Sequence, residues 1–434
     1  MSSKKIQTQL EPILWILAAA LCLSFCVQVA LKLGFFVDET VDNSAAAYHF
    51  MKTGIYSAVR FSKPFDAEIT SGLPLTWISG LVWVLGGSLF LQRLLLLAWH
   101  LGLFFALLAL AVPSPKQMLG RFGLLRATFL LWMFLLFLIP NWQTVLQNLA
   151  EIQGAIFYAF AFLLLRRQPL LAGFLLGTAV WGCKVVILPG ALLLIFMPPA
   201  WDVIFHEQRL KAGAASALKA FVGLFLPMLI WMAYITVRLD FTAAMRWPAE
   251  LFYFVTHQGG AGLSGVKYSL AERLSLSGFE WVNYPIGMKV RILFFVFAPV
   301  LVFFDSWLQL GRRWQKSDKA ILALYAAFNL GYGYWWFFRH PVMIYRHFQF
   351  ALVVSFLFLC WFYGPIIWGR FQARFSLRVA LLLFLALYFL KSNAQYLNME
   401  RGEGYYSQLC RGHLLTKECL TGTYWLLLPA GARE

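Results

Sequence analysis

Long apolar runs alternate with short basic segments along the whole chain, and this pattern predicts a bundle of membrane-spanning helices. The first run extends from Ile13 to about Gly34 and follows Lys4 and Lys5. A cleaved signal peptide has an apolar core of about 7–15 residues, so we expect this longer run to stay in the protein as a helix. The paired lysines then place the N-terminus in the cytoplasm, by the positive-inside rule.

Ten later runs are also expected to cross the membrane, and basic clusters between them mark cytoplasmic turns. A helix needs about 20 residues to cross about 30 Å of hydrocarbon, so the shorter runs predict tilted or broken elements. The expected spans lie near 94–112, 127–141, 152–166, 169–183, 185–199, 218–238, 290–310, 320–338, 347–368 and 377–393. The basic turns lie at 116–126, 166–167, 209–219, 312–319 and 370–378.

The apolar stretch Leu73–Leu91 is the one exception to this alternation. If it crossed the membrane, every later basic turn would fall on the outer side. Pro74, Gly80, Gly86 and Gly87 also make it a poor straight span. We therefore expect a helix that lies on or dips into the outer leaflet.

The predicted fold is an all-α polytopic membrane protein with about 11 transmembrane helices and surface helices in the first outer loop. Residues 1–393 form the membrane domain, with a first outer loop at 35–72 and a long outer loop at 239–289. Residues 394–434 form a short outer tail. We expect a multi-pass protein of a bacterial inner (cytoplasmic) membrane, with its active site on the outer, periplasmic face.

Composition agrees with this pattern, because 61% of the 434 residues are hydrophobic and only 13% are charged. Soluble domains have about 45–50% apolar and about 25% charged residues, so a soluble, disordered or disulfide-rich secreted protein is excluded. The net charge of +17 is explained by the basic cytoplasmic turns. We therefore expect no nucleic-acid partner, whereas membrane lipid headgroups and phosphates remain candidate partners.

Acidic residues follow the first span directly, at Asp38, Glu39 and Asp42. A carboxylate at the membrane surface, facing a cavity, could act as a general base. Asp38 could equally cap a helix or favour the positive end of its dipole. Both roles can belong to the same cluster.

A short surface helix is predicted directly after these acids, from Thr40 to Lys52, with Gly54 as its stop. No Gly or Pro interrupts this stretch, and its alanines favour helix. The spacing puts four apolar positions on one face, at Val41, Ala45, Tyr48 and Met51.

Lys184 is a lone charge in an apolar run, where a lysine costs several kcal/mol unless it meets water or an anion. It could bind a phosphate, or it could snorkel to the surface between two half-runs. Glu151 is the only charged residue between Arg126 and Arg166. It is either a functional acid or an ordinary acid at a helix N-terminus.

A late outer turn carries Arg339, His340, Arg346 and His347, where the positive-inside rule does not expect basic residues. They could hold an anionic headgroup by charge-assisted hydrogen bonds, or they could anchor the interface. In the long outer loop, Trp247 and the segment 252–257 could shape a groove for an acceptor.

The six cysteines divide into two groups. Cys410 and Cys419 both lie in the outer tail, and an oxidising compartment would let them form a disulfide. The spacing lacks the companions of a zinc site, so no metal site is predicted. Four cysteines are expected to be plain packing residues in apolar runs, Cys22, Cys26, Cys183 and Cys360.

The order of these features resembles the GT-C superfamily of polyprenyl-phosphate-sugar-dependent glycosyltransferases, which includes protein O-mannosyltransferases and the lipid A aminoarabinose transferase. The resemblance covers residues 1–200 and, more loosely, 320–368. The matching pieces, in chain order, are Asp38-Glu39 after the first span, a surface helix ending at Lys52-Thr53-Gly54, a second surface helix from Leu73-Pro74, Glu151, the Gly173-x₃-Gly177-x₆-Lys184 segment, and the pair Arg339 and Arg346.

The resemblance implies transfer of a sugar from an isoprenoid-phosphate donor to a hydroxyl of a glycan, lipid or protein, with inversion at the anomeric carbon. It assigns Asp38 as the base and Glu39 as its neighbour that orients or binds the acceptor. Lys184, Arg339 and Arg346 become the donor-phosphate clamp, with Glu151 as a secondary acid. No bound cofactor is predicted, and dependence on a divalent metal stays open.

Two other classes of protein remain alternatives. A transporter or lipid flippase would also use an intramembrane lysine and broken helices. It predicts inverted repeats and acids near the midplane, whereas no repeat is visible and the acids here follow the spans. A scaffold protein without catalysis would not need an isolated Lys184. The sequence also contains no phosphate-binding loop, HExxH or GxSxG motif.

Overall fold

The computed structural model describes a chain of helices, without a strand in the described part. The described residues are 3–32, 43–57, 64–65, 67, 73–111, 115–138, 146, 150–183, 185–206, 210–258, 269–275, 286–308, 314, 316–335, 338 and 345–397. The first half of the chain forms α1 (Ser3–Lys32), α2 (Ala45–Thr53), α3 (Leu73–Val84), α4 (Leu89–Ala111), α5 (Pro115–Leu138), α6 (Glu151–Leu164), α7 (Pro169–Gly182), the short 3₁₀ helix η3 (Val185–Ile187) and α8 (Leu188–His206). The second half forms α9 (Leu210–Arg238), α10 (Phe241–Gln258), α12 (Ile286–Leu308), α13 (Lys316–Tyr334), α14 (Tyr345–Ala373) and α15 (Phe375–Leu397).

Each expected span overlaps one of these helices, and the character of an all-α membrane protein is confirmed. Four described helices are long and apolar enough to cross a bilayer, over Leu10–Lys32, Leu89–Ala111, Gly213–Arg238 and Phe375–Gln395. Shorter apolar helices occur in α5, α6, α7, α8, α12 and α14. The total of eleven spans stays a prediction.

The first and last helices run parallel, which bears on the topology. Glu11 near the start of α1 pairs with Arg378 near the start of α15, at 3.0 Å. Further along both helices, Gln28 Nε2 donates to Asn393 Oδ1 at 2.9 Å. Two parallel helices that cross the same bilayer require an odd number of crossings from the first to the last. The pair therefore agrees with an odd count.

The stretch 73–91 is divided into two elements. A turn at Leu85–Ser88 ends α3, with Gly86 in the left-handed region at φ 74°. At 1.5 Å per residue, the 12 residues of α3 reach about 18 Å, less than the about 30 Å of a bilayer core. Arg93 Nη1 donates to Ala30 O at 3.4 Å, so α4 begins where α1 ends. The chain therefore makes no net crossing between α1 and α4.

The closest helix pair in the bundle is α7 and α9, which pack through small residues. A Cβ built on Gly173 would overlap the backbone of Ala220, and one built on Gly177 would overlap that of Leu224. Trp181 Nε1 donates to Leu224 O at 2.7 Å. The order of these contacts makes α7 and α9 parallel. The two glycines that the sequence singled out thus have a packing role, as small residues spaced by four do in membrane helices.

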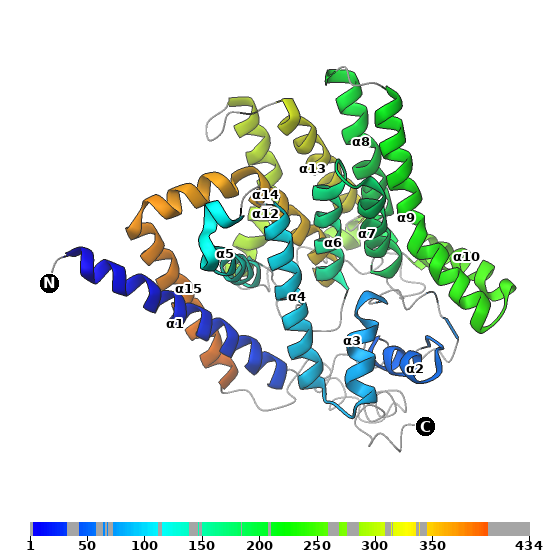
Figure 1. The fold of residues 1–434 in the computed structure, drawn as a ribbon, viewed down its shortest axis with the longest axis horizontal. Coiled ribbons are helices and arrows are strands. Elements are labelled where there is room, and N and C mark those ends of the chain that lie inside the picture. Colours follow the sequence, from blue (N-terminus) through cyan, green and yellow to red (C-terminus); the bar gives the residue numbers. More distant parts are fainter. Residues whose placement is uncertain are drawn as a thin grey trace.

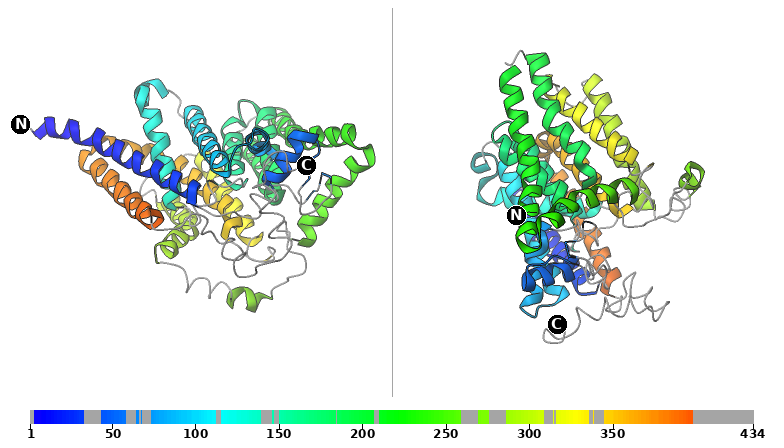
Figure 2. Two further views of the ribbon diagram at one scale, coloured as in Figure 1. Left: turned by 90° about the horizontal axis from the view of Figure 1, so that it is seen from below. Right: turned by 90° about the vertical axis from the view of Figure 1, so that its right-hand side faces the viewer.

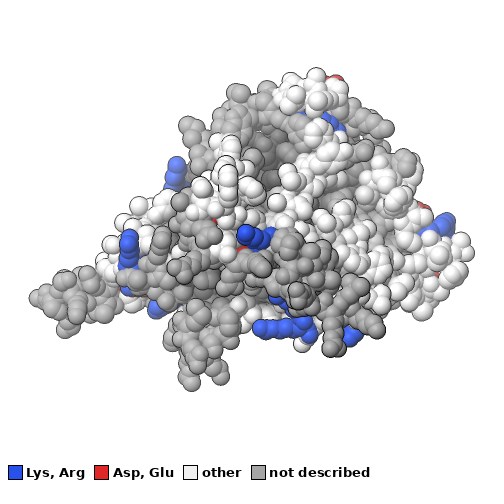
Figure 3. Space-filling model, turned by 90° about the horizontal axis from the view of Figure 1, so that it is seen from above, with Lys and Arg blue, Asp and Glu red and all other residues white. Residues whose placement is uncertain are grey.

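The surface helices gather at one end of the bundle, at the bottom of Figure 1, where α2 and α3 pack against each other. The views in Figure 2 show α10 projecting from the bundle beyond the end of α9. Seen from the opposite end, the described surface carries more basic than acidic side chains (Figure 3). This distribution agrees with the basic turns expected between spans.

Candidate functional site

Most of the residues predicted to form the site lie outside the described residues, and Glu151 is the exception. Arg346 is the second residue of α14, whose backbone is described there. The predicted residues outside the described ranges are Asp38, Glu39, Lys184, Arg339, Cys410 and Cys419. For these residues, the structure describes only the neighbouring segments of the chain.

Glu151 opens α6 and is buried, with 2% of its surface exposed. A carboxylate in the first turn of a helix is favoured by the positive end of the helix dipole. It also lies close enough to Tyr332 of α13 for the two groups to interact electrostatically. Its place at the start of α6 confirms the interpretation as a helix N-terminal acid. That role does not require burial, because an exposed acid would interact with the helix dipole equally well.

Gly154 marks the point where three candidate segments meet. It follows Glu151 by three residues and so lies on nearly the same face of α6. A Cβ built on it would be 3.1 Å from Cys183 Cβ and 3.2 Å from Phe350 Cε2. Cys183 directly precedes position 184, and Phe350 lies about one turn beyond Arg346. The starts of α6 and α14 and the end of α7 therefore converge.

An aromatic cluster packs beside this meeting point, further into the bundle. Tyr332 and Phe350 are stacked, with ring centroids 6.0 Å apart and planes at 11°. The Phe328 ring lies 5.4 Å from that of Tyr158 and 6.2 Å from that of Phe350, and the last two rings are also 6.2 Å apart. Tyr158 Oη donates to Gly190 O of α8 at 3.1 Å. Buried aromatic packing of this kind fixes the four helices rigidly around the start of α6.

The two flanks of the segment 33–42, which contains Asp38 and Glu39, are held on consecutive residues of α4. On one side Arg93, wholly buried, donates to Ala30 O. On the other side Ser44 Oγ donates to Gln92 Oε1 at 2.9 Å, in a buried bond. Trp83 Nε1 of α3 donates to the same Gln92 oxygen at 2.6 Å. The acidic segment therefore starts and ends beside the first turn of α4.

The far end of α2 is fastened to the end of α9. Gly54 stops α2 in the left-handed conformation at φ 73°, which confirms the predicted stop. Tyr234 Oη donates to Gly54 O at 2.7 Å, and the Arg238 guanidinium donates to Thr53 O. Since α9 is parallel to α7, this end of α9 is also the end where α7 reaches Cys183. The surface helices and the meeting point at Gly154 thus share one end of the bundle.

The apolar positions predicted on one face of the surface helix differ in burial. Ala45 and Tyr48 are buried, whereas Met51 is 42% exposed and packs beside Gly80 of α3. The whole run Ala45–Tyr48 is buried, since α2 packs on α3 and the preceding Ser44 is bonded to Gln92 of α4. Val41 lies outside the described residues.

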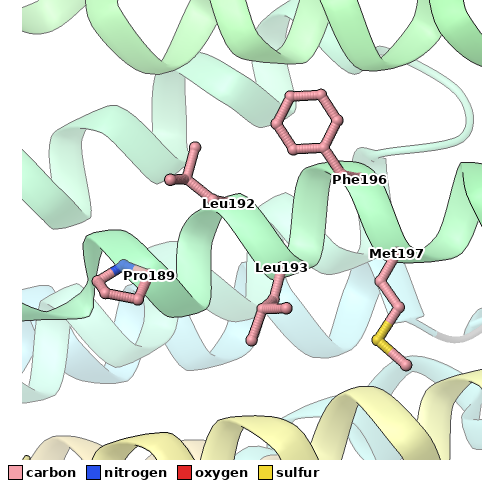
Figure 4. A pocket seen from close by; sticks show the side chains of 5 residues that line it. All are labelled: Pro189, Leu192, Leu193, Phe196 and Met197. Carbon is pink, nitrogen blue, oxygen red and sulfur yellow. The ribbon is translucent and has the colours of Figure 1, made fainter.

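A shallow hollow, open over most of its extent, lies along α8, a few residues after position 184 (Figure 4). Leu192 and Phe196 point to one side of α8, and Leu193 and Met197 point to the other. Its lining is apolar and begins at Pro189. From Pro189 to Met197 the floor is about 12 Å long. Such a surface accepts hydrocarbon and offers no partner to a polar group.

Arg93 and Gln153 are buried polar residues near the site that the sequence reasoning missed. Arg93 stands alone in an apolar run, the same signal that drew attention to Lys184, but the expected runs were divided at this residue. Gln153 is fully buried, and its amide has no hydrogen-bond partner within the described structure. Gln153 points to a different side of α6 from Glu151, because two residues turn a helix by about 200°.

Other predicted features can be placed more briefly. Trp247 is buried in α10, so it does not line an open groove. Among the described residues no three His, Cys, Asp or Glu side chains gather as metal ligands would. Cys22, Cys26 and Cys183 are buried free thiols, as expected of packing residues, and Cys360 is a half-buried free thiol.

Comparison of this chain with protein-family models, with curated proteins and with solved structures finds no match.

Proposed function

We propose that this chain is a membrane glycosyltransferase that moves a sugar from a polyprenyl-phosphate donor to a hydroxyl acceptor at the outer face of a bacterial inner membrane. The observation that carries the proposal is the convergence at Gly154. There Gly154, three residues after the buried carboxyl of Glu151, meets Cys183, which precedes Lys184, and Phe350 in the second turn of α14, at the end of the bundle that bears the surface helices. The first two segments belong to the consecutive helices α6 and α7, and the third lies almost 200 residues later in the sequence.

The chemistry proposed for the site needs one base and several cations. A hydroxyl is a poor nucleophile, so Asp38 removes its proton as the oxygen bonds to the anomeric carbon. The bond from that carbon to the phosphate oxygen breaks, and polyprenyl phosphate leaves with the bonding electron pair. Attack from the opposite face inverts the anomeric carbon. Glu39 orients the acceptor hydroxyl.

The leaving phosphate needs positive charge more than it needs a proton, because it is already a stable anion. Lys184, Arg339 and Arg346 supply that charge in a site of low dielectric constant, where charge pairs are strong. Glu151 serves as the secondary acid and orients the phosphate-binding lysine. This assignment is supported by the approach of Gly154 to Cys183, which brings the two chain segments together.

The apolar hollow on α8 is compatible with a lipid-linked donor. It begins five residues after Lys184, so a phosphate held there would leave a hydrocarbon chain beside Pro189 and Leu193. A water-soluble sugar nucleotide would gain nothing from this surface.

The proposal is tested with the purified full-length protein in lipid nanodiscs. It is incubated with a radiolabelled polyprenyl-phosphate sugar and a membrane extract as the source of acceptors. We expect sugar to appear on an acceptor, with one polyprenyl phosphate released for each sugar transferred. Movement of an intact donor across a liposome membrane, without cleavage, would instead establish a flippase.

Comparison of the cell-envelope glycans and lipids of cells with and without the gene, by mass spectrometry, identifies the acceptor. A glycan or lipid that loses one sugar residue in the deletion strain is the expected result. Envelopes of identical composition would count against the proposal.

A further inference from the structure

Helix α10 lies in the long outer loop, where the sequence predicts no helix. It has three distinct faces. At 100° per residue, Phe241, Met245 and Phe252 fall within about 40° of one another. They are 67%, 50% and 70% exposed. Such a stripe of large apolar side chains on one helix face is not expected to face water.

The other two faces of α10 have different surroundings. Its buried face belongs to the main core through Ala244, Trp247, Leu251 and Phe254. The polar residues Arg246 and Glu250 lie about 120–160° around the helix from the stripe. Besides the face that packs on protein, α10 therefore has an exposed apolar face and a polar face.

The apolar stripe of α10 continues a surface of α9 that is already apolar and exposed. Along α9 the residues Val222, Leu229, Ile230 and Val237 are 52–82% exposed. This helix contains one of the four segments long and apolar enough to cross a bilayer, and that segment ends at Arg238. Leu239, 41% exposed, joins the surface of α9 to Phe241. Any apolar surroundings that cover the exposed side chains at the end of α9 would therefore also cover the stripe on α10.

The turn between the two helices is firmly set. Asp240 caps α10, since its Oδ1 accepts from the Ala243 N–H at 2.6 Å. Arg238 is held on the end of α2 at Thr53, and Tyr234 is held at Gly54. The start of α10 is therefore capped directly after α9, and the end of α9 is held on α2.

We propose that α10 lies in the boundary between headgroups and acyl chains of the bilayer that α9 crosses. Phe241, Met245 and Phe252 enter the acyl chains, and Arg246 and Glu250 face the water. Amphipathic helices of this kind bury their apolar face about 5–10 Å into the boundary region. This placement would hold residues 241–258 against the membrane, beside the end of α2. It is independent of the proposed enzymatic activity.

The test compares two fluorescent probes on α10 of the full-length chain. Bimane is attached to Phe252→Cys on the stripe and to Arg246→Cys on the polar face, in a background whose native cysteines are replaced. The protein is reconstituted in liposomes with or without lipids brominated on the upper acyl chain, and iodide is the aqueous quencher. Both variants must first match the melting temperature of the unlabelled background protein.

We expect brominated lipid to quench the Phe252 probe several-fold more than the Arg246 probe, and iodide to show the reverse order. Equal quenching of both probes by iodide, with none by brominated lipid, would overturn the proposal by placing α10 in water. Protection of the Phe252 probe from both quenchers would also overturn it, because the stripe would then be covered by protein, such as a second copy of the chain.

Discussion

Lys184 is the residue whose role the surrounding structure constrains most, although its side chain lies outside the described residues. Cys183 before it is fully buried, and the chain continues at Val185 into η3 and α8. A lysine between these segments either meets a ligand or is held only by packing. The two roles differ in what its removal changes.

Replacing Lys184 with alanine is expected to weaken donor binding without weakening the fold. A hydrogen bond to a charged group contributes about 1.5–3 kcal/mol, so the affinity for polyprenyl phosphate should fall by about tenfold to a hundredfold. Removal of a lone intramembrane charge should not lower the melting temperature, since it relieves desolvation. Binding and melting of the purified variant are measured beside Lys219→Ala, a control on the exposed side of α9. A large drop in melting temperature with unchanged affinity would make Lys184 a structural residue.

Individual site residues were predictable from the sequence only where a charge stood alone in an apolar run. Glu151 was found in this way, and it is buried at the start of α6. Arg93 gave the same signal but was assigned to a boundary between runs. The contact of Gly154 with Cys183 and Phe350 had no signal, because it joins residues almost 200 positions apart.

At the scale of elements, the pairing of α7 with α9 depends on Gly173 and Gly177. A methyl group at either position would strike backbone atoms of α9, which cannot turn away as a side chain can. The pair also sets the end of α7 that leads to position 184. The site therefore requires that α7 and α9 stay closely packed.

Gly177→Ala is expected to destabilise the protein by about 1–3 kcal/mol, the usual cost of overpacking. Gly102→Ala on α4 is the matched control, because nothing lies within 4 Å of a Cβ there. Alanine favours helix over glycine by about 1 kcal/mol, so the control should be neutral or stabilising. Both are measured as melting temperatures of the solubilised protein. The same change in both variants would show that α7 and α9 are less closely packed than described.

A polar side chain also links α1 to α15. Asn393 Oδ1 accepts from Ser24 at 3.0 Å and from Gln28 at 2.9 Å, and its Nδ2 donates to Leu21 O at 2.8 Å. Its neighbour Ser392 bonds only within its own helix, to Tyr388 O. Asn393 therefore bonds to the neighbouring helix, whereas Ser392 bonds within its own helix.

Asn393→Leu is expected to cost about 1–2 kcal/mol, since interhelical hydrogen bonds in membranes average about 0.6 kcal/mol and reach about 1.7. Ser392→Ala should change the free energy of unfolding little. Unfolding in a denaturing detergent provides the measurement. If Asn393→Leu unfolds at the same detergent concentration as the wild type, the link contributes nothing to stability.

Helices were the easiest part of the fold to predict, and α10 shows why one was missed. The spans follow from long apolar runs, whose mean composition reveals them. In α10 two apolar faces are separated by Arg246 and Glu250, so its average composition resembles that of a loop. Its period of 3.6 residues becomes meaningful only when the buried face is known.

For the whole molecule, the parallel arrangement of α1 and α15 places the end of α15 on the side opposite the start of α1, from which we predict that the tail is also on that side. With the N-terminus in the cytoplasm, we expect a cysteine introduced at Glu403 to react with an impermeant maleimide on intact cells. A cysteine at Gln208, between α8 and α9, should react only after lysis. The opposite labelling pattern would invert the protein and put the proposed site on the cytoplasmic side.

The central claim is that Asp38 is the base of a sugar transfer, and Asp38→Asn tests it most directly. Asparagine caps a helix almost as well as aspartate, so a capping role predicts a folded and active variant. It cannot accept the proton of the hydroxyl, and such a base contributes typically about 10²–10⁴-fold in rate.

Sugar transfer from purified lipid donor is measured for Asp38→Asn and Glu39→Gln beside the wild type, after each variant shows an unchanged melting temperature. The account predicts that Asp38→Asn is folded and at least a hundredfold slower, because the lost base accounts for about that factor or more. Activity within a few-fold of wild type for Asp38→Asn would contradict it, and a loss confined to Glu39→Gln would move the role of base to Glu39.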